Sequence, residues 1–358
     1  MWWVPRVTHS LEEPIRDPSG GLGQRGGMAI TGMAATERNT SRRGAWVMGL
    51  RILASAVMLA LLLPRIDITS ILPRGQHVAT ARWLTLGIVV TLLGFVLSAW
   101  RWQRVLRVFD QRVGLPTLVS HYLAGQFVGN FLPSTIGGDV LRVTRLTPQV
   151  GSSATSFASV VLERMTGWVI LPVLTLVGLA LQPSLFDLGV APRLALGLAA
   201  TTLALLSLIL VAAGSENLGG RFADHQGWQR FIGAVHVGVA NLKRHPSEAS
   251  GVVVAAAVYQ LSMVATVFMA TRALGLDVPL AAVLAFAPAV LIAQVLPFSL
   301  NGLGLREGAF VLFLTPLGVT TTQAVGVGLL IYGMTLAVSV LGAPAFAVGS
   351  RHTRARTV

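Results

Sequence analysis

Long apolar stretches alternate with shorter polar segments over most of the chain. Six of them are long enough to cross a bilayer as an α-helix, because about 20 apolar residues span its hydrocarbon core. They are residues 46–63, 83–100, 155–182, 194–213, 251–271 and 322–349. Two further stretches, 117–133 and 280–298, end in segments rich in proline and glycine instead of a polar loop. The pattern therefore predicts an all-α polytopic membrane protein with two irregular membrane segments.

Polar segments flank this apolar region. Residues 1–44 are polar and rich in glycine and contain no apolar run, so we expect a disordered, basic cytoplasmic tail. Residues 45–349 contain all the apolar stretches and form the expected membrane domain. Residues 350–358 form a second basic cytoplasmic tail.

Arginine and lysine are distributed unevenly between the connecting loops. If the N-terminus is cytoplasmic and 117–133 re-enters instead of crossing, the cytoplasmic loops and tails carry more of them than the outer loops. The cytoplasmic loops are then 101–116, 139–154 and 214–250, and the outer loops are 64–82, 183–193 and 272–321. Because positive residues favour the cytoplasmic side, we expect a multi-pass protein of the cytoplasmic membrane with both termini inside.

The composition agrees with a membrane protein. Only 11% of the residues are charged and 53% are hydrophobic, whereas a soluble domain has about 25% charged residues. The formal net charge of +13 comes almost entirely from arginine, since Lys243 is the single lysine. Membrane orientation explains this excess, so we expect no nucleic-acid partner. Without cysteine the chain has no disulfide, thiolate nucleophile or thiolate-bound metal.

The two irregular segments are followed by the same motif. An amide, Leu, Pro, Gly, Leu and Arg recur at identical offsets, from Asn130 to Arg142 and from Gln294 to Arg306, 164 residues apart. A Leu-Thr-Pro triplet ending at Pro148 is repeated at Pro316. The ordered agreement predicts a duplication, with repeat halves of roughly 46–182 and 194–349.

Duplication has a consequence for topology. If 117–133 and 280–298 are both re-entrant, each half has three full crossings, and an odd number places the halves in opposite orientations. We therefore predict two inverted repeats of three spans each plus a re-entrant broken helix, an architecture of many secondary transporters. In an alternative with eight full spans, both 280–298 and 305–319 cross and Asn301–Gly304 faces the cytoplasm.

Charged residues fall inside the membrane segments and need a reason, because each costs about 2.5–3.5 kcal/mol on insertion scales. In the first motif Pro133 ends a helix, Gly137 and Gly138 permit a sharp turn, and Asp139 opens the next helix. Asp139 and Arg142 share a helix face. The charged candidates are Asp139, Arg142, Arg145, Glu163, Arg164, Arg306 and Glu307.

Two interpretations of these charges stay open. In the first, loop N–H groups and a helix N-terminus, assisted by Arg142, Arg145 and Arg306, form an anion pocket for a phosphate. In the second, the charges only neutralise one another. Asp139 then pairs with Arg142, and Arg306 with Glu307. Adjacent helix residues point in different directions, so we expect Glu163 to pair with Arg142 or Arg145, and Arg164 with Asp139.

Three runs of sequence, 129–142, 156–167 and 296–307, together resemble the lysylphosphatidylglycerol synthase transmembrane-region family, also called flippase-like domain proteins. In its bifunctional members this region is similar to a lipid flippase joined to a cytosolic aminoacyl transferase domain. We expect no such domain after residue 349, so the resemblance implies the lipid-handling half and supports lysine transfer less.

We therefore expect a protein that binds and translocates an anionic lipid, either a phospholipid or a polyprenyl-phosphate conjugate. The alternatives are a membrane subunit that supplies lipid to a separate transferase and an integral-membrane lipid or glycosyl transferase. We expect no catalytic residue, cofactor or metal, and, besides lipid, a separate transferase or a second copy as possible partners. The candidate head-group-binding residues are Asn130, Pro133, Gly137, Gly138, Asp139, Arg142, Arg145, Glu163, Arg164, Gly302, Gly304, Arg306 and Glu307.

Overall fold

The computed structural model describes residues 77–131, 137–214, 228–294 and 302–347, and all regular structure in these ranges is helical. The α-helices are α2 (His77–Val108), α3 (Leu115–Phe131), α4 (Gly137–Val150), α5 (Ser153–Leu181), α6 (Val190–Gly214), α8 (Trp228–Arg244), α9 (Pro246–Ala273), α10 (Leu280–Ala293), α11 (Leu305–Leu314) and α12 (Thr321–Val340). Short 3₁₀ segments occupy Pro183–Leu188 and Thr315–Leu317, and residues 342–347 are again helical.

Five of the described helices, α2, α5, α6, α9 and α12, are long and apolar enough to cross a membrane. They coincide with the predicted stretches 83–100, 155–182, 194–213, 251–271 and 322–349. The predicted span 46–63 and the two tails lie outside the described residues. The chain is thus an all-α multi-pass membrane protein.

The two irregular segments form pairs of short helices. The first pair is α3 and α4, and the second is α10 and α11. With 14 and 10 residues, α10 and α11 are about 21 and 15 Å long, too short to cross about 30 Å of hydrocarbon individually. The choice between re-entrant segments and eight full spans stays a prediction.

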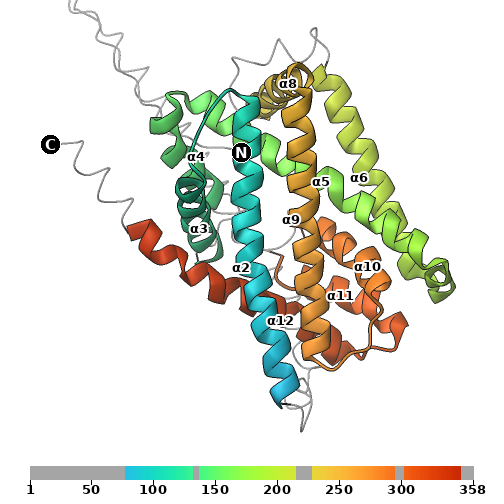
Figure 1. The fold of residues 1–358 in the computed structure, drawn as a ribbon. Coiled ribbons are helices and arrows are strands. Elements are labelled where there is room, and N and C mark those ends of the chain that lie inside the picture. The colour runs from blue at the N-terminus through green and yellow to red at the C-terminus, as the bar shows by residue number, and fades with distance from the viewer. Residues whose placement is uncertain (1–76, 132–136, 215–227, 295–301, 348–358) are drawn as a thin grey trace, which may run out of the picture.

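The order of elements is the same in both halves. A long helix, two short helices and a second long helix follow one another in α2–α5 and again in α9–α12. The packing also repeats, because α2 contacts α12 as α9 contacts α5, and α3 contacts α12 as α10 contacts α5. In Figure 1 the equivalent helices α2 and α9 lie side by side and run in opposite directions. Inverted repeats have this arrangement, although the symmetry itself stays a prediction.

Glycines allow helices of different halves to approach closely. A Cβ atom on Gly178 of α5 would overlap the backbone of Ala285 in α10. A Cβ atom on Gly342 would likewise overlap the carbonyl group of Leu123 in α3. Small residues at such contacts are typical of packed membrane helices.

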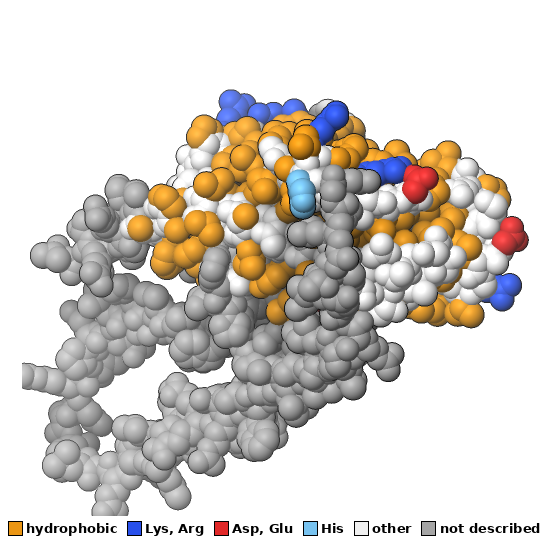
Figure 2. All heavy atoms as spheres, turned by 90° about the horizontal axis from the view of Figure 1, so that it is seen from below, with side chains coloured by type: hydrophobic (Ala, Val, Ile, Leu, Met, Phe, Trp, Pro, Cys, Tyr) orange, Lys and Arg blue, Asp and Glu red, His pale blue; other side chains and the backbone are white. Residues whose placement is uncertain are grey.

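The outer surface is apolar, as expected where helices face lipid. On α6 the side chains of Leu205, Leu208 and Val211 are 56%, 65% and 72% exposed. Figure 2 shows mainly hydrophobic side chains over the described part of the lower face. The buried residues include charged and hydroxyl side chains, so polarity is concentrated inside the helix bundle.

One predicted boundary is wrong. The loop expected from residue 101 does not begin there, because α2 continues to Val108. Arg101 and Trp102 are buried within this extension. The last two turns of α2 therefore belong to the protein interior and not to a basic cytoplasmic loop.

Candidate functional site

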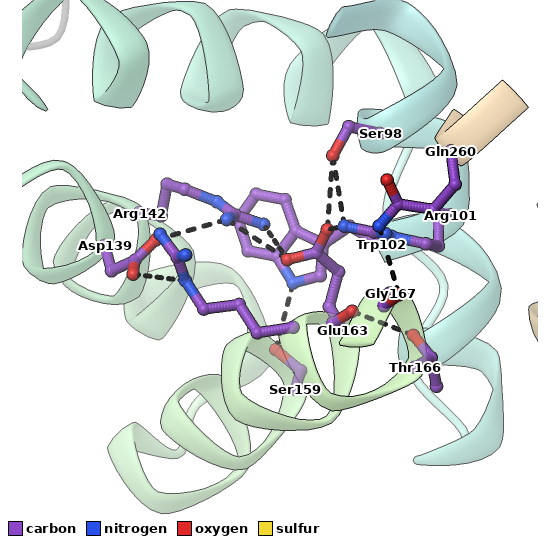
Figure 3. A network of polar contacts seen from close by, with 11 residues as sticks. Ser98, Arg101, Trp102, Asp139, Arg142, Ser159, Glu163, Thr166, Gly167 and Gln260 are labelled. Atoms are coloured by element: carbon purple, nitrogen blue, oxygen red, sulfur yellow. Dashed lines mark hydrogen bonds and ion pairs between the residues drawn. The ribbon is translucent and has the colours of Figure 1, made fainter. Parts of the chain in front are cut away.

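Five charged side chains from three helices contact one another, and Figure 3 labels four of them, Arg101, Asp139, Arg142 and Glu163. They are Arg101 of α2, Asp139 and Arg142 of α4, and Glu163 and Arg164 of α5. Their contacts connect them in a row of alternating sign, with an arginine at each end. We refer to these five residues as the charge row.

Glu163 occupies the buried part of the row and is only 1% exposed. One carboxylate oxygen, Oε1, forms an ion pair with Arg101 and accepts a hydrogen bond from the Ser98 hydroxyl at 3.1 Å. The other, Oε2, lies 3.3 Å from the guanidinium of Arg142. Glu163 therefore joins α2 to α4 through α5, and its predicted pairing with Arg142 is confirmed.

Asp139 connects the other part of the row. Its Oδ1 lies 3.3 Å from Nη1 of Arg142, and its Oδ2 lies 2.6 Å from Nε of Arg164. Both pairings agree with the sequence prediction. Asp139 stands in the first turn of α4, where the helix dipole also favours a carboxylate.

Aromatic rings cover the faces of the two buried arginines. The guanidinium carbon of Arg142 lies 4.2 Å from the ring centre of Trp102 and 4.9 Å from that of Tyr122. That of Arg101 lies 4.4 Å from the ring centre of Tyr259 in α9. Trp102 is fully buried and donates a hydrogen bond to Ser159 at 3.1 Å. Cation–π contact partly compensates the lost hydration of each guanidinium.

Glycines make room for the row. Gly137 opens α4, and a Cβ on Gly138 would overlap the carbonyl oxygen of Gly125 in α3. A Cβ on Gly125 would lie 3.0 Å from Cγ of Arg142. A Cβ on Gly167 of α5 would lie 2.7 Å from Nη1 of Arg101. The glycines therefore allow the helix backbones and the arginines to come close.

The row carries an excess of positive charge, because its three arginines face two carboxylates. Within the described residues, Nε and Nη1 of Arg101 and Nε of Arg142 are buried without a hydrogen-bond partner. Arg164 differs from both, since its side chain is 48% exposed. It is the twelfth residue of the 29-residue helix α5, about 17 Å from the start of that helix. The row therefore runs from a buried arginine to an accessible one.

The residues of the second motif form a separate group. Oε2 of Glu307 accepts a hydrogen bond from the Gly304 N–H at 2.7 Å, and its Oε1 lies 2.5 Å from Nη2 of Arg306. The guanidinium of Arg306 also lies over the ring of Tyr332 at 5.0 Å. Gly302 and Gly304 have φ values of 78° and 81°, which favour glycine.

This second group is closed and electrically balanced. Arg306 and Glu307 are both buried, and each is the ion-pair partner of the other. In Figure 1 α11 and α4 lie on opposite sides of the α2–α9 pair. Among the described residues, Arg306 and Arg142 therefore belong to separate groups of contacts.

Two of the remaining candidates make contacts outside the charge row. Arg145 donates hydrogen bonds to the carbonyl oxygens of Ala345 and Phe346, each at 2.9 Å, so of the two partners predicted for Glu163 the structure has Arg142. Asn130 donates to the hydroxyl of Ser339 in α12 at 2.6 Å. Pro133 lies outside the described residues.

Arg101 was missed by the sequence interpretation. It directly follows the apolar window 83–100 and is the first residue of the predicted loop 101–116. The signal that could have found it is periodicity. Gly94 and Ser98 share one helix face inside the window, and Arg101 continues that face just beyond it.

Comparison with known proteins agrees with this arrangement. Residues 47–342 match the family model described as the lysylphosphatidylglycerol synthase transmembrane region. No curated protein matches the chain. The family match covers most of the chain and includes both motifs, and all ten named α-helices begin within it. The chain therefore belongs to the lysylphosphatidylglycerol synthase transmembrane-region family, as a multi-pass membrane protein of the flippase-like type.

Proposed function

We propose that this protein binds the anionic head group of a membrane lipid at the charge row and moves the lipid across the bilayer. The observation that carries the proposal is the exposure of Arg164 well inside a membrane-spanning helix. An arginine facing hydrocarbon costs about 2.5–3.5 kcal/mol or more. Asp139 contacts Nε of this arginine, so the exposed part of the guanidinium favours a further anion in the membrane, and a lipid phosphate is one.

The electrostatics of the row favour an anion over a cation. Three guanidinium groups share two carboxylates, so the head group would meet one excess positive charge. Asp139 holds Nε of Arg164, and the side chain of Arg164 is 48% exposed, so its guanidinium is accessible to a ligand. A planar guanidinium can bind two phosphate oxygens with two parallel hydrogen bonds. We propose Arg164 as the first contact of the phosphate and Arg142 as its support.

The apolar surroundings of the charge row favour a lipid as the source of the phosphate. The outer faces of the helices are apolar, so acyl or polyprenyl chains can stay in the bilayer while the head group reaches the row. Membership of a flippase-like family supports the same assignment. The proposal covers a phospholipid or a polyprenyl-phosphate conjugate and requires no chemical change of the lipid.

Reconstitution tests the proposal. Purified protein is placed in vesicles with short-chain fluorescent phosphatidylglycerol or phosphatidylcholine, and albumin extraction reports how fast each lipid reaches the outer leaflet. We expect the protein to accelerate phosphatidylglycerol more than phosphatidylcholine. We expect Arg164→Gln to reduce this rate at least tenfold. The matched control is Arg193→Gln, which removes an exposed arginine near the start of α6. Equal rates for wild type and Arg164→Gln would refute the role of Arg164.

A further inference from the structure

We propose that the head group crosses the protein along the interface between α2 and α9, which opens during transport. This inference rests on the function proposed above and names the path that leads from the charge row. We define the α2–α9 seam by its facing residues. They are Gly87, Thr91, Gly94, Ser98 and Arg101, which share one face of α2, and Tyr259, Ser262 and Thr266 of α9, which contact Arg101, Gly94 and Thr91 respectively.

The α2 side of the seam consists of small or polar residues along most of its length. Its five residues follow one another at spacings of four, three, four and three, which places them on one face of the helix. All five are buried. From Gly87 to Arg101 this face is about 21 Å long, most of the roughly 30 Å of the hydrocarbon core.

The α9 side presents hydroxyl groups to this face. The hydroxyl oxygens of Thr91 and Thr266 are 3.4 Å apart. A Cβ on Gly94 would lie 3.0 Å from the hydroxyl oxygen of Ser262. The α2–α9 interface is also the most extensive contact between any two described helices. The most extensive contact between the two halves therefore contains hydroxyl groups in a protein whose surroundings are apolar.

These hydroxyls can serve a passing head group. Thr91 donates to the carbonyl oxygen of Gly87, Ser262 to that of Tyr259, and Thr266 to that of Ser262. Each is satisfied within its own helix while the seam is closed. A hydroxyl can rotate and also keeps acceptor capacity, so each can exchange its helix carbonyl for a phosphate or glycerol oxygen when the helices separate.

A second observation points to a ligand at one end of the seam. Arg101 lies against Tyr259 of α9, its side chain is 5% exposed, and its Nε and Nη1 are unpartnered within the described residues. Buried donors of this kind are costly unless something accepts their hydrogen bonds. Because Arg101 is also the buried end of the charge row, a head group that leaves Arg142 meets these donors as it enters the seam.

Methionines close the other end. A Cβ on Gly87 would lie 2.5 Å from Sδ of Met334 in α12 and 3.5 Å from Cβ of Met269 in α9. Methionine side chains are flexible and adapt to changing shapes. They can seal the seam in the closed state and move aside when the helices separate.

A cross-link between the helices tests the path. The chain contains no cysteine, so Thr91→Cys with Thr266→Cys introduces a single pair, at positions whose hydroxyl oxygens are 3.4 Å apart. We expect oxidation to join α2 to α9, to reduce albumin-monitored phosphatidylglycerol movement at least tenfold, and reduction to restore it. Each single cysteine variant, treated with the same oxidant, controls for modification of the thiol alone.

The outcomes separate this inference from the proposed function. If the reduced double variant and the wild type move no lipid, the proposed function fails. If both move lipid and the cross-linked protein is equally fast, transport stands and the seam is refuted. Failure of the pair to cross-link also contradicts a closed seam.

A second set of variants removes hydroxyls without adding a bond. A seam used only for packing tolerates Thr91→Val with Thr266→Val, because the shapes are similar. If the seam is the path of the head group, we expect this double valine variant to lose at least threefold in the rate of phosphatidylglycerol movement, with an unchanged melting temperature. Thr202→Val is the matched control, since its hydroxyl bonds to its own helix at Leu198 but lies on α6. Full transport by the double valine variant would overturn the inference.

Discussion

Arg101 of α2 and Glu163 of α5 form a buried ion pair that joins the first long helix to the second. Arg142 of α4 shares the same carboxylate. This single glutamate therefore holds three helices of the first half together. The same contact links α2, one wall of the seam, to the row that we propose binds the head group.

Removing the carboxylate of Glu163 is expected to destabilise the protein strongly. Glu163→Gln leaves Arg101 without an acidic partner and Arg142 with Asp139 alone. Loss of one partner of a buried ion pair costs about 3–5 kcal/mol. Thermal unfolding in detergent measures the effect. Glu248→Gln, which breaks a half-exposed 3.9 Å pair with Arg104, is the control, with an expected cost of about 1 kcal/mol or less.

The contact between α3 and α4 depends on the absence of a side chain at Gly138. In Gly138→Ala the new Cβ overlaps the carbonyl oxygen of Gly125, and backbone atoms cannot rotate away. We expect a loss of about 1–3 kcal/mol in the free energy of unfolding. Gly333→Ala in α12 meets nothing within 4 Å and should leave stability unchanged or raise it by up to about 1 kcal/mol. Equal melting temperatures for the two variants would contradict the close contact.

Arg145 is expected to act on the C-terminal helical segment. Arg145→Gln removes two hydrogen bonds to the carbonyl oxygens of Ala345 and Phe346, each worth about 1.5–3 kcal/mol because the donor is charged. Hydrogen exchange should accelerate in residues 342–347 and remain as in wild type in α9. Unchanged exchange in 342–347 would show that Arg145 does not hold this segment.

The second motif is expected to behave as a helix cap. Glu307→Ala leaves Arg306 buried without a carboxylate and the Gly304 N–H without its partner, so we expect a stability loss of about 3–5 kcal/mol. The double variant Arg306→Met with Glu307→Leu removes both charges and should recover part of this loss. Melting temperatures of the single and double variants in detergent check the coupling. A double variant less stable than Glu307→Ala would count against the pair.

The sequence by itself determined the five described spans, the two short-helix segments and the pairs within the first motif. Bilayer thickness demands long apolar runs, which can be read directly. The pairing of Asp139 with Arg142 follows from helix periodicity, since three residues separate them on one face.

The sequence also predicts the contacts of Glu163 with Arg142 and of Arg164 with Asp139, but only the tertiary structure decided which other charges join them. Arg142 and Arg306 occupy the same place in the two motifs, yet one belongs to a row with excess positive charge and the other is balanced by Glu307. Arg101 joined the row because α2 continues beyond its apolar window and packs on α5 and α9. Hydropathy indicates which segments can face lipid. The partners inside a bundle depend on how helices distant in sequence pack together, and no local pattern records that packing.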